Sequence, residues 1–257
     1  MNFSPLNINQ APVLSPDTLK SWGKVLAIAP HPDDEALCCG GTLALLAQLR
    51  VPTAVLWVSN GAASHPDSKS YAAPKLANLR EAEGKMALDK LGVGRKNSFF
   101  LRLPDGAVPF PGDAGFERAL DETRSILEDF APRTLLLPWR RDAHRDHRAS
   151  WQLLSRAAQG LEVQTFEYLV WALAQAEPQN WPQNAEASAF AVDISKVLAR
   201  KKAAIRAHAS QTTRLVRDDP GNFRISADFI AQCENSHEAW IAPFCSLPEI
   251  AGRAKPR

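Results

Sequence analysis

The amino-acid sequence predicts an α/β fold with a mostly parallel β-sheet, and three observations support this prediction. Short apolar runs alternate with longer stretches of helical periodicity between residues 24 and 171, which is typical of successive βαβ units. The runs are mostly apolar throughout, as expected of parallel strands that are covered on both faces. Polar clusters follow two of these runs, at the position where open α/β sheets bind their ligands.

Length and composition indicate a single domain over residues 1–257, in which residues 1–21 form an irregular arm with a short helical turn. The chain has 257 residues, of which 45% are hydrophobic and 23% charged, as in ordinary soluble globular proteins. Its net charge of +2 gives no reason to expect nucleic acid or an anionic membrane as a partner. No run approaches the ~18 apolar residues that a transmembrane helix needs, and the N-terminus lacks a signal-peptide pattern. We therefore expect a cytoplasmic protein.

The four cysteines suggest neither a disulfide framework nor a thiolate metal site. They contain no C-x-x-C pair, and two of them are adjacent within a helical pattern. We interpret them as small buried apolar residues; they are Cys38, Cys39, Cys233 and Cys245.

The first strand and helix are predicted at residues 24–29 and 35–49. The helix contains Gly40 and Gly41, each of which costs it about 1 kcal/mol relative to alanine. Such a cost suggests that the helix backbone closely approaches the sheet or a ligand.

The second strand, residues 53–58, runs into a long polar loop that contains His65 and Asp67. Loops of this length are uncommon unless they are functional, so these two residues are either solvated or in contact with substrate. A helix follows at residues 72–91 and ends at Gly92, and a third strand at 98–103 is closed by a turn that contains Asp105.

The remaining elements continue the alternation. We expect a helix at 113–130, a strand at 134–137, a helix that ends at residue 158 and a strand at 165–171. Residues 172–188 form a surface excursion, and residues 194–208 form a basic helix whose Lys and Arg side chains, including Lys201, are solvated. Together these elements predict a Rossmann-like, three-layer α/β domain.

Two clusters of ionisable residues follow the first and fourth strands. Residues 31–35 read HPDDE, and residues 142–147 read DAHRDH. Because the carboxyl ends of parallel strands share one edge of the sheet, both clusters can reach one crevice. One histidine and three acidic residues within five positions are costly to group unless a cation lies among them, so we interpret the clusters as a metal site rather than a salt-bridged network.

Imidazole and carboxylate ligands without thiolates suit Zn²⁺ and, less selectively, Fe²⁺, Mn²⁺, Co²⁺ or Ni²⁺. A catalytic zinc usually has three protein ligands and one open position. His31, one aspartate of the first cluster and one histidine of the second would complete such a set.

The sequence APHPDDEALCCGG at residues 29–41 resembles the signature of the PIG-L/LmbE-like zinc-dependent N-acetylglucosaminyl deacetylases, and DAHRDH resembles their second motif. Weaker similarities fall on the helix with Arg80 and Glu83 and on the stretch from Lys202 to Gln211. The chain departs from the family pattern at Cys38, at Arg145 and in the turn at residues 60–62, which leaves the metal set intact and the substrate-selecting loops in question.

The resemblance implies a role for each matching residue. His31, Asp34 and His147 would hold the metal, and Asp33 would be the general base. A protonated His144 would stabilise the oxyanion, and Asp146 would orient His144.

Four further residues have two interpretations each. Arg80 binds substrate or forms a helix-surface ion pair with Glu83. Glu35 supports the metal site or is a favourable acid at a helix N-terminus. We interpret Asp105 as a turn former rather than a substrate ligand, and His208 as a core or surface histidine rather than a metal ligand.

The predicted function is removal of the acetyl group from an N-acetylglucosamine-type sugar or conjugate by attack of a metal-bound water. The alternatives are a metal-dependent hydrolase of another amide or ester, and a sugar-binding relative without turnover. A nucleotide-binding protein is poorly supported because no G-x-G-x-x-G follows the first strand. The partner would be a small N-acetylated sugar or glycoconjugate, and a homo-oligomer remains open.

Overall fold

A computed structural model of the chain describes residues 4–171, 173, 177–221 and 223–244. Seven strands form one sheet in the order β3-β2-β1-β4-β5-β7-β6. The strands are β1 (Val25–Ala29), β2 (Thr53–Ser59), β3 (Ser98–Leu103), β4 (Thr134–Pro138), β5 (Gln164–Tyr168), β6 (Ala187–Asp193) and β7 (His237–Pro243). The first five strands are parallel to one another. β7 pairs antiparallel with β5, and β6 pairs antiparallel with β7. The prediction of a mostly parallel sheet is confirmed.

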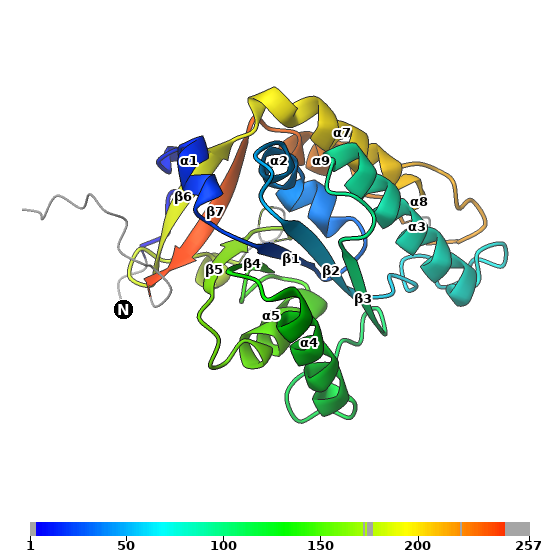
Figure 1. The fold of residues 1–257 in the computed structure, drawn as a ribbon. Helices are drawn as coiled ribbons and strands as arrows, with labels where there is room; N and C mark the ends of the chain where they lie inside the picture. The colour runs from blue at the N-terminus through cyan, green and yellow to red at the C-terminus, as the bar shows by residue number, and fades with distance from the viewer. Residues whose placement is uncertain (1–3, 172, 174–176, 222, 245–257) are drawn as a thin grey trace, which may run out of the picture.

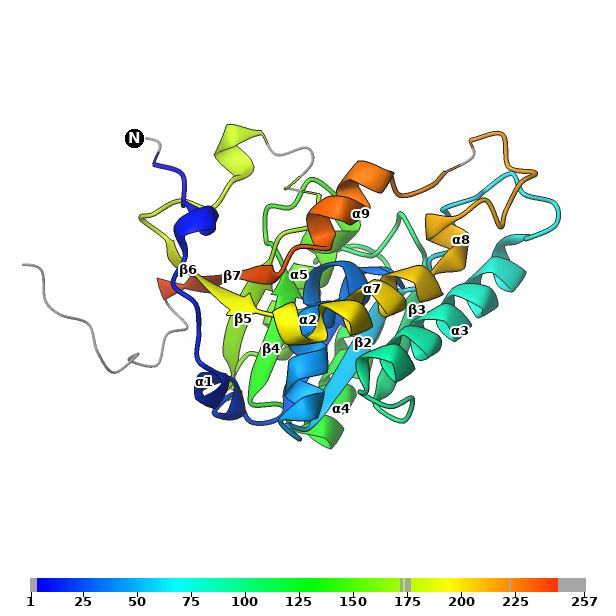
Figure 2. The ribbon, with the colours of Figure 1, turned by 90° about the horizontal axis from the view of Figure 1, so that it is seen from above.

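Helices cover both faces of this sheet and make three layers (Figure 1). One face carries α2 (Asp34–Gln48), α3 (Ala73–Leu91), α7 (Leu198–Ala207) and α9 (Ala227–Cys233), and the other carries α4 (Phe116–Phe130) and α5 (Arg145–Ala157). Viewed from above, α2, α3 and α7 lie side by side (Figure 2). Two apolar clusters fill the layers, one on each face of the sheet.

The glycine pair in α2 packs against the C-terminal part of the chain, not against the sheet. A Cβ atom on Gly41 would lie 2.4 Å from the side chain of Ile194, and one on Gly40 would lie 3.1 Å from Lys201. The helix backbone is closely approached, but by Ile194 and α7, so the prediction that the sheet or a ligand is the partner is wrong. Lys201 is only 2% exposed and pairs with Glu238, so the prediction of a solvated Lys201 is wrong.

The N-terminal arm is more ordered than the sequence predicts. It contains a 3-10 turn, η1 (Ile8–Gln10), and the helix α1 (Pro16–Lys20), and it bridges to residues next to and within β6. The structure also adds the short helix α8 (Ala209–Thr212) and the 3-10 turns η2 (Pro178–Asn180) and η3 (Ser195–Val197).

The three described cysteines, Cys38, Cys39 and Cys233, are free thiols, and Cys245 lies outside the described residues. Part of the predicted excursion at residues 172–188 also lies outside them. Over the described part of the chain, no helix is long and apolar enough to cross a membrane.

Candidate active site

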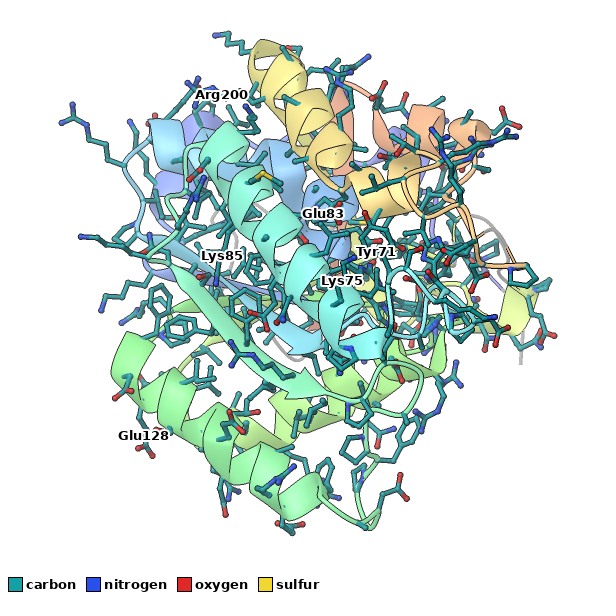
Figure 3. All side chains as sticks on the ribbon, turned by 90° about the vertical axis from the view of Figure 1, so that its right-hand side faces the viewer. Tyr71, Lys75, Glu83, Lys85, Glu128 and Arg200 are labelled. Carbon is teal, nitrogen blue, oxygen red and sulfur yellow. The ribbon has the colours of Figure 1, made fainter. Side chains whose placement is uncertain are left out.

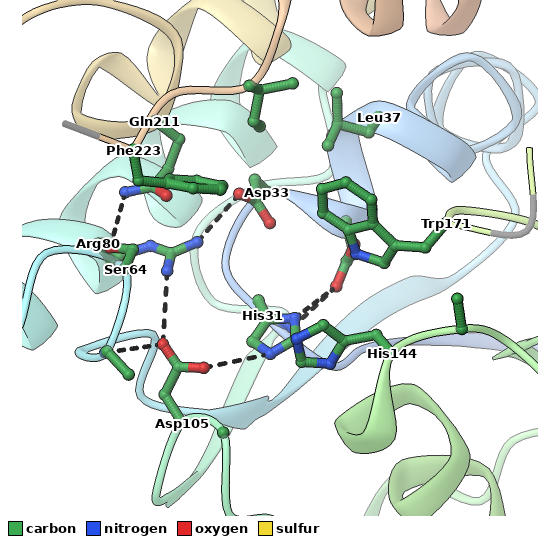
Figure 4. Close-up of a pocket in the computed structure, with 15 residues that line it drawn as sticks. His31, Asp33, Leu37, Ser64, Arg80, Asp105, His144, Trp171, Gln211 and Phe223 are labelled. Atoms are coloured by element: carbon green, nitrogen blue, oxygen red, sulfur yellow. Dashed lines mark hydrogen bonds and ion pairs between the residues drawn. The ribbon is translucent and has the colours of Figure 1, made fainter. Parts of the chain in front are cut away.

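A pocket of about 520 Å³ opens at the carboxyl edge of the parallel strands (Figure 4). The segment that follows each parallel strand contributes to its lining, with His31, Ser64, Asp105, His144 and Trp171. The C-terminal part of the chain adds a further wall with Gln211, Phe223 and Ile225. The two ionisable clusters therefore do meet in one crevice.

Two of the predicted metal ligands, His31 and His147, lie close to one carboxylate oxygen of the third, Asp34. Asp34 Oδ2 lies 3.3 Å from His31 Nδ1 and 3.3 Å from His147 Nε2, and all three side chains are buried. Burial raises the pKa of Asp34, but His147 and His31 outweigh this and hold that pKa far below its usual value. Asp34 is therefore ionised and lies between two imidazoles.

These distances are compatible with a shared cation as well as with long hydrogen bonds. A charge-assisted N–H···O bond spans about 2.7–2.9 Å, whereas ligand atoms about 2.0–2.2 Å from a tetrahedral zinc lie about 3.4 Å apart. The buried ring of His147 makes no hydrogen bond at either nitrogen to any described residue. Asp142 Oδ1 lies 3.6 Å from its Nδ1, on the side where a carboxylate commonly supports a metal-ligating histidine. The residues present therefore fit a divalent metal.

His144 and Asp105 are close enough to enter alternative donor sets. Ligand atoms of His31, His144 and His147 lie within 4.8 Å of one another, as do those of His31, Asp105 and Asp146. His144 Nδ1 accepts the main-chain N–H of Asp146 at 3.2 Å, so the proton of a neutral ring is on Nε2. Such a ring has no lone pair left for a metal and is instead a hydrogen-bond donor.

The expectation of a protonated His144 is corrected. Burial and the neighbouring His31 and His147 lower the pKa of His144 to about 4, so the ring is neutral at pH 7. It can still stabilise an oxyanion through the Nε2–H group.

We expected Asp146 to orient His144. In the structure its main-chain N–H, and not its carboxylate, donates to His144 Nδ1. Its carboxylate accepts the N–H groups of Gly106 and Val108 and lies 3.3 Å from His31 Nε2. The side chain is fully buried. The amide of Asp146 therefore orients His144, while the carboxylate supports His31.

Arg80 is bound to the protein rather than free to meet a substrate. Its Nη2 atom lies 3.0 Å from Asp33 Oδ2 and donates to Pro32 O, and its Nη1 atom donates to Gly61 O. The alternative ion pair with Glu83 is wrong, because Glu83 accepts both the N–H and the hydroxyl of Ser210. Arg80 lines the pocket but is placed to support Asp33.

Asp33 has the electrostatic environment of a general base. Burial raises the pKa of its carboxyl to about 6, with Asp34 adding to the rise and Arg80 opposing it. A base is most effective when its pKa lies near the working pH, and this value meets that condition.

The structure decides between the interpretations of three other residues. Glu35 is buried and bonds to His208, Trp57 and the main chain of Asp33, so it is a support and not a surface acid. His208 is a core histidine, as expected. His65 is buried and bonds to Ser64 and to Phe223 O, so it is neither solvated nor part of the pocket lining.

The remaining loop residues differ from expectation in one case. Asp67 is exposed, and its main-chain N–H donates to Asp219. Asp105 lies in the turn after β3, as predicted, but it also lines the pocket, with Oδ1 3.3 Å from His31 Nε2 and Oδ2 accepting the N–H of Ala63.

Sequence reasoning did not place Asp105 in the site, gave Asp142 no role and did not predict the C-terminal wall of the pocket. Asp105 follows the third parallel strand, so the rule that joined the other two clusters also applies to it. Asp142 begins the second motif and was left without a role. The placement of Phe223 depends on how the C-terminal segment folds back, for which the sequence has no local signal.

The fold and the pocket define a class of α/β protein with a histidine and carboxylate site, fit for a divalent metal, at the carboxyl ends of parallel strands. The sequence model described as "PIG-L: GlcNAc-PI de-N-acetylase" matches residues 26–158, which is more than half of the chain. The chain belongs to the PIG-L family.

A relative and two solved structures illustrate the similarity. The chain is 28% identical over 201 residues to the probable N-acetyl-alpha-D-glucosaminyl L-malate deacetylase 2 of Bacillus cereus, covering 76% of this chain and 86% of that protein. N,N'-diacetylchitobiose deacetylase from Pyrococcus horikoshii has a TM-score of 0.62 at 23% identity, covering 89% of this chain and 87% of that one. GalB, the 4-carboxy-2-hydroxymuconate hydratase of Pseudomonas putida KT2440, has a TM-score of 0.64 at 16% identity, with coverage of 90% and 99%. At these identities the two structures establish the fold alone.

Proposed function

We propose that this protein is a metal-dependent N-deacetylase that hydrolyses the acetamide of an N-acetylglucosamine-type sugar or conjugate. The observation that carries the proposal is that Asp34 Oδ2 lies 3.3 Å from both His31 Nδ1 and His147 Nε2, while Asp33 and His144 line the same pocket as His31 and Asp34. Family membership and the printed name of the Bacillus cereus relative support the reaction and the N-acetylglucosaminyl group.

His31, Asp34 and His147 would hold the metal, with zinc as the first choice among divalent transition metals. A bound divalent metal polarises an amide carbonyl and makes an attacking water more acidic. The carboxylates of Asp105, Asp146 and Asp142 then fix the two histidine ligands from behind.

Asp33 takes a proton from the attacking water while the oxygen of that water forms a bond to the acetamide carbon. The Nε2–H of His144 donates to the oxygen that becomes negative, a contribution typically worth about 3–4 kcal/mol. When the C–N bond breaks, Asp33 returns its proton to the departing amine, since a neutral His144 has no proton to spare. The products are acetate and the free amino sugar.

Acetate release by the purified protein tests this function. The substrates would be N-acetylglucosamine, its conjugates, other N-acyl compounds and esters, each assayed with wild type and Asp33→Asn. We expect release from N-acetyl sugars and a loss of roughly 10²–10⁴-fold in Asp33→Asn, which has no base at that position. Undiminished release by Asp33→Asn would show that the base is wrong. If the protein hydrolyses another amide or an ester faster than N-acetyl sugars, the proposed substrate class is wrong.

We propose a cytoplasmic location, which cell fractionation tests; mass measurement in solution decides between a monomer and a homo-oligomer.

A further inference from the structure

Behind Asp33 lies a buried carboxylate that the proposed chemistry does not use. Glu35 is 0% exposed and makes three contacts. Its Oε2 atom accepts the main-chain N–H of Asp33 at 3.0 Å and the indole N–H of Trp57 at 2.9 Å. Its Oε1 atom lies 2.6 Å from His208 Nε2. The carboxylate therefore joins the base to two distant parts of the chain.

Asp33 needs such a contact because its backbone is unusual. Its φ is 157° and its ψ is −28°, a combination that a residue with a side chain rarely adopts. Conformations of this kind persist only where the surroundings hold them in place. The bond from the N–H of Asp33 to Glu35 fixes the main chain, and Arg80 fixes the carboxylate.

Both partners of Glu35 are themselves anchored. Trp57 is fully buried, stacks on Phe100 with ring centroids 4.7 Å apart, and is approached closely by Gly84 of α3. His208 is 1% exposed and stands between α7 and α8. Glu35 is thus held between β2 and the C-terminal part of the chain.

The segment that carries His208 is bound to α3 through a second buried carboxylate. Glu83 accepts the N–H of Ser210 at 2.7 Å and its hydroxyl at 2.6 Å. Figure 3 shows Glu83 on the side of α3 that faces α7 and α8, whereas Lys85 lies on its other side. The segment that carries His208 is therefore anchored to α3 through Ser210 and Glu83.

We infer that Glu35 and His208 form a positioning pair that holds Asp33 in its strained conformation, with its carboxylate in the pocket. Neither residue lines the pocket, so neither touches the substrate. His208 lies outside the residues 26–158 that match the family model, so the C-terminal third of the chain takes part in the site through it. The role in turnover rests on the proposed function; the role in holding Asp33 does not.

The chain contains a matched control for a purely structural pair. Glu238 accepts the N–H groups of Gly41 and Thr42 in α2 and pairs with Lys201 of α7 at 2.7 Å. Glu238 resembles Glu35 because it is buried, accepts main-chain N–H groups of the same segment and pairs with a basic side chain from the region of α7. It does not contact Asp33.

The test compares Glu35→Met, Glu35→Gln and Glu238→Met with wild type. Methionine has a similar volume but no strong acceptor, whereas the glutamine oxygen can still accept from Asp33 and Trp57. Measurements are kcat, KM, zinc per chain, the melting temperature and crystal structures of wild type and Glu35→Met.

We expect Glu35→Met to lower kcat by roughly 10–100-fold with KM within about twofold, as for a base displaced by about 1 Å. Its zinc content should equal that of wild type, and its crystal structure should show Asp33 away from φ 157°. Glu35→Gln should rescue most of the rate. Glu238→Met should lower the melting temperature without lowering kcat of the folded enzyme.

Wild-type kcat in folded Glu35→Met, an unmoved Asp33 in its crystal structure, or an equal kcat loss in Glu238→Met would overturn the inference. If Glu35→Met does not fold, His208→Gln and His208→Met provide the same comparison: the first can still donate to Glu35, and the second cannot. If wild type releases no acetate, the proposed function fails, while the position of Asp33 in the two crystal structures still decides the inference.

Discussion

Asp33 and Asp34 are adjacent in the sequence and have opposite electrostatic environments. Burial raises the pKa of Asp33 to about 6, whereas two histidines hold the pKa of Asp34 far below its usual value despite burial. One carboxylate is therefore suited to exchanging a proton and the other to binding a cation. The sequence allowed this division because neighbouring side chains point in different directions, and the different partners of the two carboxylates, His147 for Asp34 and Arg80 for Asp33, agree with it.

Removing His147 and removing His144 should have different effects on metal content. We expect His147→Ala to lose most of its bound zinc, because one of three ligands is gone. His144→Ala should keep its zinc and lose roughly 10²–10³-fold in kcat, as for one oxyanion donor. Zinc per chain by atomic spectroscopy, together with acetate release, checks both. Zinc loss in His144→Ala would place that histidine among the ligands.

The pH dependence of kcat/KM should report on the pair of Asp33 and Arg80. Asp33 must be deprotonated to act as base, so the rate should fall as the pH drops through its pKa. Arg80 lowers that pKa, so Arg80→Gln should raise it and move the acidic limb to higher pH. Arg102→Gln, which breaks an exposed pair with Glu81, is the control and should leave the limb in place. An acidic limb that stays fixed in Arg80→Gln would exclude Asp33 as the titrating group.

At the scale of elements, the five parallel strands and the helices between them were predictable because their apolar patterns are continuous and local. The antiparallel strands β6 and β7 were not predicted, because they pair with each other across some 40 residues of intervening chain, which no local pattern indicates. The burial of Lys201 and His208 was equally invisible, because their partners Glu238 and Glu35 lie far away in sequence.

The contact between α2 and the C-terminal segment predicts unequal effects of two adjacent substitutions. Gly41→Ala would place a methyl group 2.4 Å from Ile194, so it should lower the free energy of unfolding by about 1–3 kcal/mol through overpacking. Gly40→Ala would place a methyl group 3.1 Å from Lys201 Cγ and 3.6 Å from Leu91 Cδ2, a milder approach, and should stay within about 1 kcal/mol of wild type, helped by helix propensity. Urea unfolding of the two variants measures the difference. Equal stabilities would show that Ile194 does not pack on α2 as described.

For the whole molecule, parallel topology brings loops from five strands to one edge, and this is why two short motifs sufficed to predict the position of the site. The same rule places the proposed metal ligands, the proposed base and Asp105. The far wall with Gln211, Phe223 and Ile225 comes from the C-terminal segment and was not predictable. This wall and the loop after β2 enclose the space next to the catalytic residues, so they are the regions where the acceptor of the acetamide would be recognised (Figure 4).

Dependence of acetate release on a bound metal tests the central claim most directly. The protein would be assayed as purified, after removal of metal by a chelator and dialysis, and after addition of zinc. We predict that the rate falls by at least about 10²-fold without metal and returns with roughly one equivalent of zinc per chain, because the three ligands form one site. A metal-free protein that releases acetate from N-acetyl sugars at the original rate would contradict the account.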